Sequence, residues 1–222
     1  MCDDPDPMPN PTAVPVRFTP ESSLKATRLL ARRDPALARL VKVHGTCGLG
    51  QRIPRNSFAA LVRAIVFQQL STGAATTIYN RVLATMNARK CPPPATWLAL
   101  PEAQLRAAGL STQKTKYILD LCRHVTDGSL DTRHLHRLGD EEVIERLTQV
   151  KGIGRWTAEM FLMFHLQRPD VLPLGDLGVV TGFAKVYGNG TKLTADQINA
   201  IGDAWRPYRS IGAWYMWRAL EA

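Results

Sequence analysis

The spacing of apolar and polar positions is helical along most of this chain. Apolar residues recur at helical spacing from Glu21 onward, and Leu61, Val62, Ile65 and Val66 form one apolar stripe of this kind. The strict alternation of apolar and polar residues that is typical of strands is almost absent. The pattern therefore predicts an all-α protein built from about ten short helices.

Start and stop signals place these helices along the chain. The Asp34-Pro35 pair begins one helix, Ser57 is the expected N-cap of another, and a break at 71–73 precedes the next. Beyond Pro35, helices are expected at 58–70, in a stretch ending near 86, and at 112–125, 140–148, 155–166, 178–187, 195–204 and 207–220. A connector at 47–54, a loop at 91–94 and an extended segment at 168–177 separate them. The proline-rich start is expected to be extended or disordered.

The charge of the chain is strongly positive and unevenly spread. Twenty-eight Lys and Arg residues against 19 Asp and Glu give a formal net charge of +9, which excludes an acidic solvating protein and favours a polyanion such as nucleic acid as partner. No acidic residue occurs from Pro35 to Pro101, whereas this stretch holds the cations Arg39, Lys42, Arg52, Arg55, Arg63, Arg81, Arg89 and Lys90. This distribution indicates a shaped positive surface, and the alternative is a solvated face on which charges cluster by chance.

The cysteine spacing and the hydropathy argue against a metal-binding cysteine site and against a membrane protein. Cys2, Cys47, Cys91 and Cys122 form no C-x-x-C pair, so a zinc ribbon or an iron–sulfur cluster has no support and reduced thiols are expected. No run of about 18 apolar residues predicts a membrane span, and the acidic start lacks the apolar core of a signal peptide. We expect an intracellular protein without a membrane partner, in the cytoplasm or nucleoid if the source is bacterial.

The segment with the most specific chemistry joins two expected helices. Residues 147–158 read LTQVKGIGRWTA, in which Gly152 and Gly154 permit a tight turn and the close approach of another backbone. Backbone N–H groups at such a turn and at the following helix N-terminus suit a phosphate, and an ordinary helix–helix turn is the alternative. The candidate phosphate-binding residues are Lys151, Gly152, Gly154, Arg155 and Thr157.

This segment resembles the hairpin of the helix-hairpin-helix DNA glycosylase superfamily, and the resemblance extends over most of the chain. It implies a flexible leader at 1–18 and two helical lobes with a cleft between them. The first lobe comprises 19–55 and 168–222, and the second, which holds the hairpin, comprises 56–167. The resemblance also implies a sodium or potassium ion bound by the backbone carbonyls of Thr148, Val150 and Ile153, and no other cofactor is expected.

Asp176 is the candidate catalytic residue. It stands just before an expected helix in the segment LPLGDLG, so capping that helix is the alternative, and the two roles can coexist. The resemblance favours catalysis because the alkylpurine branch of the superfamily carries its essential aspartate shortly after the hairpin. Cleavage of an N-glycosidic bond builds positive charge on the sugar, which a carboxylate stabilises while it activates water.

Trp156 stands where lyase-competent members of the superfamily carry a nucleophilic lysine. Indole cannot form a Schiff base, so the resemblance implies a monofunctional glycosylase, similar to DNA-3-methyladenine glycosylase II, that leaves an abasic site. Its expected partner is double-stranded DNA containing alkylated bases such as 3-methyladenine and 7-methylguanine, and a monomer is expected. The alternatives are a non-catalytic helix-hairpin-helix DNA-binding protein and a glycosylase with lyase activity that uses another lysine, such as Lys151.

An enzyme that acts on a base in duplex DNA must flip the base out and fill the gap. Residues 58–71 resemble the superfamily's helix and turn that carry the intercalating residue, for which Gln69 is the first candidate and Leu70 the second; a plain helix C-terminus is the alternative. A cationic methylpurine stacks well on aromatic faces. The candidate base-pocket residues are Trp156, Trp217, Phe67, Met160 and Trp214, although aromatic residues at helical spacing usually belong to the core.

Overall fold

The structure, a computed structural model, describes residues 17–50 and 56–221. These ranges hold twelve α-helices, two short 3₁₀ helices and no strand, which confirms the all-α prediction. Most of the expected leader, the end of the connector at 47–54, Cys2, Arg52 and Arg55 lie outside the described residues.

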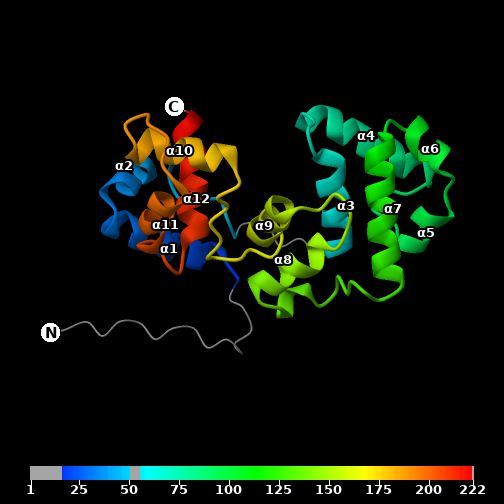
Figure 1. Ribbon diagram of the computed structural model, residues 1–222, viewed down its shortest axis with the longest axis horizontal. Helices are drawn as coiled ribbons and strands as arrows, with labels where there is room; N and C mark the ends of the chain where they lie inside the picture. Colours follow the sequence, from blue (N-terminus) through cyan, green and yellow to red (C-terminus); the bar gives the residue numbers. More distant parts are fainter. Residues whose placement is uncertain (1–16, 51–55, 222) are drawn as a thin grey trace.

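The helices form two groups on either side of the molecule in Figure 1. The first group consists of α1 (Pro20–Arg33), α2 (Pro35–His44), α10 (Leu177–Tyr187), α11 (Ala195–Asp203) and α12 (Arg209–Arg218), which runs into the 3₁₀ helix Ala219–Glu221. The second consists of α3 (Ser57–Phe67), α4 (Thr72–Thr85), α5 (Pro94–Ala99), α6 (Glu102–Ala107) and α7 (Thr112–Thr126). In the first group α12 contacts α1, α2, α10 and α11, and in the second α7 contacts α3, α5 and α6.

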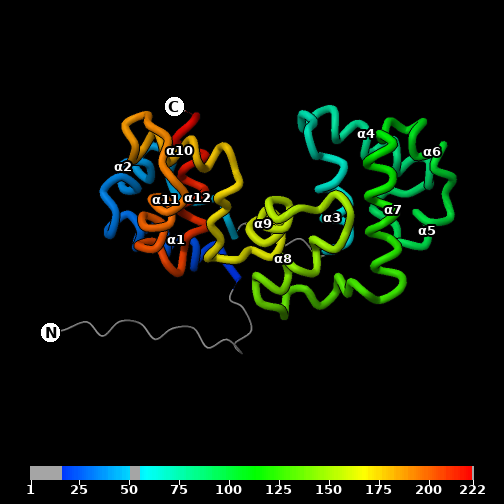
Figure 2. The backbone as a smooth tube through the Cα atoms, in the orientation of Figure 1, coloured from blue at the N-terminus to red at the C-terminus, as the bar shows by residue number. Residues whose placement is uncertain are grey.

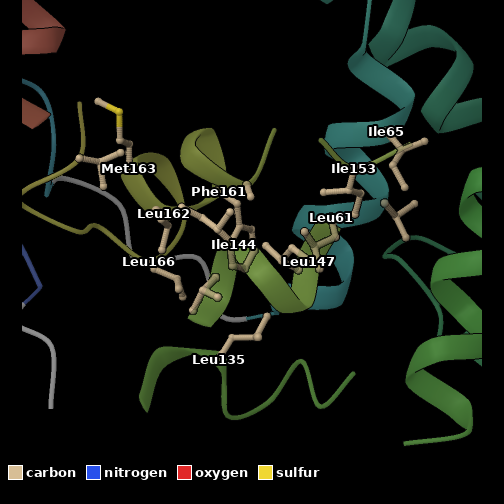
Figure 3. Close-up of a cluster of buried hydrophobic side chains, with 14 of the residues drawn as sticks. Leu61, Ile65, Leu135, Ile144, Leu147, Ile153, Phe161, Leu162, Met163 and Leu166 are labelled. Carbon is tan, nitrogen blue, oxygen red and sulfur yellow. The ribbon is translucent and has the colours of Figure 1, made fainter. Parts of the chain in front are cut away.

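Two further helices, α8 (Asp140–Thr148) and α9 (Arg155–Phe164), lie between the two groups in Figures 1 and 2 and follow the 3₁₀ helix Leu135–Arg137. They pack on each other, and α9 also packs on α3. Figure 3 shows the apolar core around them, to which α3 contributes Leu61 and Ile65, α8 Ile144 and Leu147, and α9 Phe161, Leu162 and Met163. This core holds the hairpin between α8 and α9 against the second group.

The start of α3 differs from the prediction by one residue. Asn56, not Ser57, is the N-cap, because its side chain accepts a 3.0 Å hydrogen bond from the Ala59 N–H. The Ser57 hydroxyl instead lies 3.0 Å from Nε2 of His165. Both residue types can cap a helix, and the partner that occupies Ser57 comes from a distant part of the chain.

The end of α3 also differs from the prediction. The helix stops at Phe67, since Gln68 has an extended ψ of 130° and Gln69 a left-handed φ of 56°. Ser71 then caps α4, with its hydroxyl 3.4 Å from the Ala74 N–H. The expected break therefore exists but begins at residue 68 and ends at residue 71, and we call 68–71 the Gln69 turn.

Asp34 joins three elements of the first group. Its Oδ1 caps α2 by accepting from the N–H groups of Ala36 and Leu37, at 2.8 and 3.2 Å. Its Oδ2 accepts from the hydroxyl of Tyr187 on α10, at 2.7 Å, and from the indole N–H of Trp205, at 3.0 Å. Four donors thus converge on one carboxylate, which ties the amino-terminal helices to the carboxyl-terminal ones.

Replacing Asp34 with alanine is expected to lower the free energy of unfolding by about 3 kcal/mol, because a helix cap is lost and the donors of the half-buried Tyr187 and the buried Trp205 lose their acceptor. Urea denaturation measures this change. Asp203→Ala is the matched control, since Asp203 is exposed and pairs only with the exposed Arg206 in the described contacts. Equal denaturation midpoints for the two variants would contradict the role given to Asp34.

His165 makes the stability of the fold depend on pH. Its ring is 8% exposed and stacks on Phe161 with a centroid separation of 4.6 Å, and burial lowers the pKa of the imidazole to about 4. The unfolded chain takes up this proton near the ordinary pKa of about 6.5, so it binds more protons than the folded chain between these values. Stability is therefore expected to fall as the pH drops from about 6.5 to about 4.

Thermal unfolding at a series of pH values tests this expectation. His165→Gln should flatten the midpoint's dependence on pH over that window, because glutamine does not titrate. The control His136→Gln removes an exposed histidine and should leave the dependence as it is. A His165→Gln curve parallel to that of the unchanged protein would show that another group is responsible.

The described cysteines are free thiols: Cys47, Cys91 and Cys122. Burial raises the pKa of the Cys47 and Cys122 thiols to about 12, so both are protonated at neutral pH. Within 17–50 and 56–221, no cluster of His, Cys, Asp and Glu is arranged to hold a metal ion. None of the described helices combines the length and the apolar character needed to cross a bilayer.

Candidate active site and nucleic-acid interface

Asp176 lies at the centre of the candidate active site, at the N-cap of α10. Its Oδ1 accepts from the Val179 N–H at 2.8 Å and from the indole N–H of Trp217 at 2.8 Å. Its Oδ2 accepts from the indole N–H of Trp156 at 2.7 Å. The carboxylate is 9% exposed, and its three partners can only donate, as a carboxylate acceptor requires. Capping and a place in a functional site thus coexist in this residue.

A glycine lets the second indole reach this carboxylate. A Cβ placed on Gly178 would lie 2.8 Å from the Trp217 ring and 3.1 Å from Oδ1 of Asp176. Both distances are shorter than ordinary van der Waals contact, so a larger residue at position 178 would push Trp217 away. The segment after Asp176 is therefore built for the close approach of Trp217.

Aromatic and apolar side chains surround Asp176 and remain open to solvent. Trp156 and Phe164 are each 45% exposed, and the ring of Phe164 stacks on that of Trp217 with centroids 5.6 Å apart. Trp156, Met160 and Phe164 follow one another at i, i+4 and i+8 on α9, so they share one helix face. Leu177, directly after Asp176, is 80% exposed. An aromatic surface of this kind suits a planar, electron-poor ligand.

Phe164 is a site residue that the sequence analysis missed. Its spacing from Trp156, eight residues along the same helix, places both on one face and is a signal that could have found it. Its contact with Trp217 depends on how α9 and α12 approach each other, which no local pattern reveals.

The surface next to Asp176 is hollowed on two sides. One hollow of about 480 Å³ is lined by Asp176 and Leu177 together with Lys192 and the start of α11. Another, of about 420 Å³, has Trp156 in its wall and extends to Gln69, Tyr117 and Gly152. Trp156 therefore connects the carboxylate with the Gln69 turn and the hairpin.

The structure gives two other candidate pocket residues different partners. Phe67 lies beneath Arg63, with the guanidinium carbon 3.8 Å from the ring centroid, and the same group lies 5.9 Å from the ring of Tyr79 on α4. Trp214 faces Arg218, with the guanidinium carbon 5.1 Å from its ring, and borders Gly48. Of the five candidates, Trp156 and Trp217 are the ones that donate to Asp176.

The hairpin occupies the residues between α8 and α9. Gly152 has a φ of +83°, and a Cβ at this position would lie 2.1 Å from the ring of Tyr117 on α7, so only glycine fits here. Gly154 begins α9 without a side-chain cap. The N–H groups of the first turn of α9 lack intrahelical acceptors, which leaves them for an anion such as a phosphate.

The charged residues of the hairpin already have partners in the free protein. The Lys151 N–H donates to Oδ2 of the buried Asp120 at 2.9 Å, and its ammonium lies 3.8 Å from Oδ1. Arg155 donates to both oxygens of Glu141, at 3.0 and 2.7 Å, and to Glu159 at 3.1 Å. The Lys151 side chain is 77% exposed and can still turn toward a phosphate, whereas the Arg155 guanidinium is shared between two carboxylates.

The two candidate intercalating residues lie in an exposed turn next to the hairpin. Gln69 and Leu70 are both exposed at the Gln69 turn, and the side-chain amide of the neighbouring Gln68 donates to the Gly152 carbonyl at 2.8 Å. Thr157, in contrast, is only 6% exposed. The Gln69 turn, which carries the candidate intercalating residues, is therefore joined to the hairpin by the hydrogen bond of Gln68.

Comparisons with known proteins show the family of this chain. Residues 62–207 match the family model for the HhH-GPD superfamily base excision DNA repair protein. DNA-3-methyladenine glycosylase 1 of Schizosaccharomyces pombe is 34% identical over 202 residues, which cover 90% of this chain and 89% of that protein.

Two solved structures also resemble this fold. A DNA-3-methyladenine glycosidase from Bacillus halodurans has a TM-score of 0.78 and 38% identity, covering 90% of this chain and 89% of that one. The Schizosaccharomyces pombe 3-methyladenine DNA glycosylase in complex with abasic DNA has a TM-score of 0.76 and 33% identity, covering 89% and 97%. This chain belongs to the HhH-GPD superfamily of base excision DNA repair proteins.

Proposed function

We propose that this protein is a monofunctional DNA glycosylase that excises alkylated bases, such as 3-methyladenine and 7-methylguanine, from double-stranded DNA. The observation that carries the proposal is the carboxylate of Asp176, held between two indole N–H groups beside an exposed aromatic surface. Relatives named as 3-methyladenine glycosylases support the same substrate class.

Asp176 supplies the chemistry of bond cleavage. As the N-glycosidic bond lengthens, its electron pair moves to the purine, and positive charge develops on the deoxyribose. The carboxylate stabilises this charge and orients the water, whose oxygen bonds to C1′ as its proton passes to the carboxylate. An alkylated purine that is already cationic leaves as a neutral base, so the site needs no second acid to protonate it.

The aromatic surface accounts for the preference for an alkylated base. The exposed faces of Trp156 and Phe164 offer π-systems to a base flipped out of the duplex, and a cationic ring gains most from such contacts. The exposed Gln69 or Leu70 would fill the gap left in the base stack. A non-catalytic DNA-binding protein would need neither the carboxylate nor this surface, so that alternative is not favoured.

The absence of lyase activity follows from the residue at position 156. An indole N–H that donates to Asp176 cannot act as an amine nucleophile. The other candidate, Lys151, holds its ammonium 3.8 Å from Oδ1 of Asp120, so this amine already has a partner in the hairpin. Borohydride reduction during turnover should therefore trap no covalent adduct with DNA.

The hairpin is the segment proposed to bind the DNA backbone. Its free N–H groups and Lys151 would bind phosphates, so affinity should fall steeply as salt rises. The carbonyls of Thr148, Val150 and Ile153 are proposed to hold a sodium or potassium ion. That of Val150 accepts the Ile153 N–H at 3.1 Å and keeps a second lone pair for the ion. The protein is also proposed to be a monomer and to act inside the cell.

Release of free methylpurine from alkylated duplex DNA tests the proposed function. The protein is expected to release 3-methyladenine and 7-methylguanine and to leave abasic sites that alkali, but not the protein itself, converts to strand breaks. Binding to the same DNA without any release across a panel of lesions would contradict the proposal and favour the binding-protein alternative.

A further inference from the structure

Lys114, in the first turn of α7, holds the backbone of the Gln69 turn. Its ammonium donates to the carbonyl of Val66 at 2.7 Å and to that of Gln68 at 2.6 Å. These carbonyls stand at the C-terminal end of α3, where no further helical N–H is available to them. A lysine at this place satisfies both oxygens and complements the negative end of the helix.

The backbone that Lys114 holds is in an unfavourable conformation. Gln69 has a φ of 56°, which a residue with a side chain adopts only when its surroundings enforce it. Leu70 and the Gln69 side chain project from this strained turn and are exposed. Their direction therefore depends on the contacts that keep the turn from relaxing.

The same helix also supports the hairpin. Tyr117 lies one turn after Lys114 on α7, and its ring packs so closely on Gly152 that no Cβ fits between them. The side-chain amide of Gln68 donates to the Gly152 carbonyl at 2.8 Å. The Gln69 turn and the hairpin are thus joined to each other directly and to α7 through Lys114 and Tyr117.

Direct binding of phosphate does not explain Lys114 as well as this structural role does. Two carbonyls already occupy its ammonium, and partial burial lowers the pKa of the amine. Lys116, two residues further on, is exposed and takes part in neither contact. Lys116 carries the same charge on the same helix. Substituting it therefore shows the effect of losing one positive charge, apart from the effect of losing the contacts of Lys114.

We propose that Lys114 is a positioning residue that fixes the Gln69 turn relative to the hairpin. The hairpin then binds the DNA backbone while the Gln69 turn, held rigidly to it, inserts into the base stack. This inference rests on the proposed glycosylase function. It predicts that Lys114 matters for extruding a paired base and matters little once the base is unpaired.

The test compares Lys114→Met with Lys116→Met under single-turnover conditions. Lys114→Met should release the alkylated base from fully paired duplex between about tenfold and a hundredfold more slowly, as expected when a reacting group is slightly misplaced. Most of this loss should disappear when the lesion lies opposite an abasic-site analogue, because an unpaired base costs less to extrude. Lys116→Met should match the unchanged protein on both substrates.

Two further measurements keep the outcome clear. A 2-aminopurine next to the lesion reports unstacking by its fluorescence, without base release, and should respond less with Lys114→Met. Gln68→Leu removes the link to Gly152 and should show the same dependence on pairing, which covers the case in which Lys114→Met does not fold. Lys114→Arg, which keeps donors for both carbonyls, should restore much of the rate.

Equal rates for Lys114→Met and Lys116→Met would overturn the inference. So would a loss of equal size on paired and unpaired lesions, which would place Lys114 in general stability or in the chemical step. Failure of the unchanged protein to release any base, together with 2-aminopurine unstacking that Lys114→Met reduces and Lys116→Met does not, would instead contradict the proposed function and leave the positioning role supported.

Discussion

Asp176→Asn is expected to slow base release by about a thousandfold or more, as the loss of a preorganised electrostatic group does in other enzymes. The amide keeps the size of the carboxylate but loses the charge that stabilises the sugar cation. It also presents an NH₂ group to at least one of the indole N–H donors, Trp156 or Trp217, that now face an oxygen. Two donors cannot bond to each other, so the aromatic surface should shift as well.

Single-turnover release of methylpurine measures this loss, and the affinity for the same duplex shows whether binding survives. Affinity should change little, because the hairpin and the Gln69 turn are untouched. Asp196→Asn, which alters an exposed acid on α11, should keep the full rate. An Asp176→Asn variant with the full rate would remove Asp176 from the mechanism.

Gly152→Ala is expected to lower the free energy of unfolding by about 2 to 5 kcal/mol, since a left-handed φ and an overlap with a half-buried, packed neighbour each cost energy. The added Cβ would lie 2.1 Å from the Tyr117 ring, so the hairpin must move away from α7. That movement would also stretch the hydrogen bond from Gln68 to the Gly152 carbonyl. Affinity for DNA should fall together with stability.

Denaturation by urea and binding to an abasic duplex provide the two measurements. Gly139→Ala is the control, because a Cβ at position 139 meets nothing within 4 Å and the backbone there has ordinary angles. Its stability should fall by no more than about 1 kcal/mol, as expected when alanine replaces glycine at an N-cap. If the two glycine variants were equally stable, the contact with Tyr117 would not matter to the fold.

Local signals were sufficient where a helix is marked at both ends. The acidic first turn, the apolar face and the glycines that follow predict 140–148, and the structure has Asp140–Thr148. The six-residue helices α5 and α6 are not predicted, because so few residues contain less than two helical turns. The end of α3 is missed because Gln69 has a left-handed φ, and the ammonium that bonds to the neighbouring Gln68 carbonyl comes from Lys114 on another helix.

Most residues of the candidate site could be predicted from the sequence, but only some of their contacts could. Asp176, Trp156 and Trp217 could be chosen because motifs in order along the chain resemble those of a known superfamily, and the structure brings the three into hydrogen-bond contact. The ion pair of Arg155 with Glu159 is predictable from their i, i+4 spacing. The pairing of Arg155 with Glu141 is not, since it depends on the angle between α8 and α9.

The contacts of α12 have a consequence for synthesis of the chain. Helices α1 and α2 are made before α3 to α9, yet they pack against α12, which is made after all of these. The helices from α3 to α9 pack on one another and can assemble while the chain is still being extended, whereas the surfaces of α1 and α2 that contact α12 stay uncovered until α12 is made. If synthesis stopped before α12, the released chain would have α3 to α9 folded and the apolar faces of α1 and α2 exposed. Chaperones and proteases recognise such exposed apolar surface.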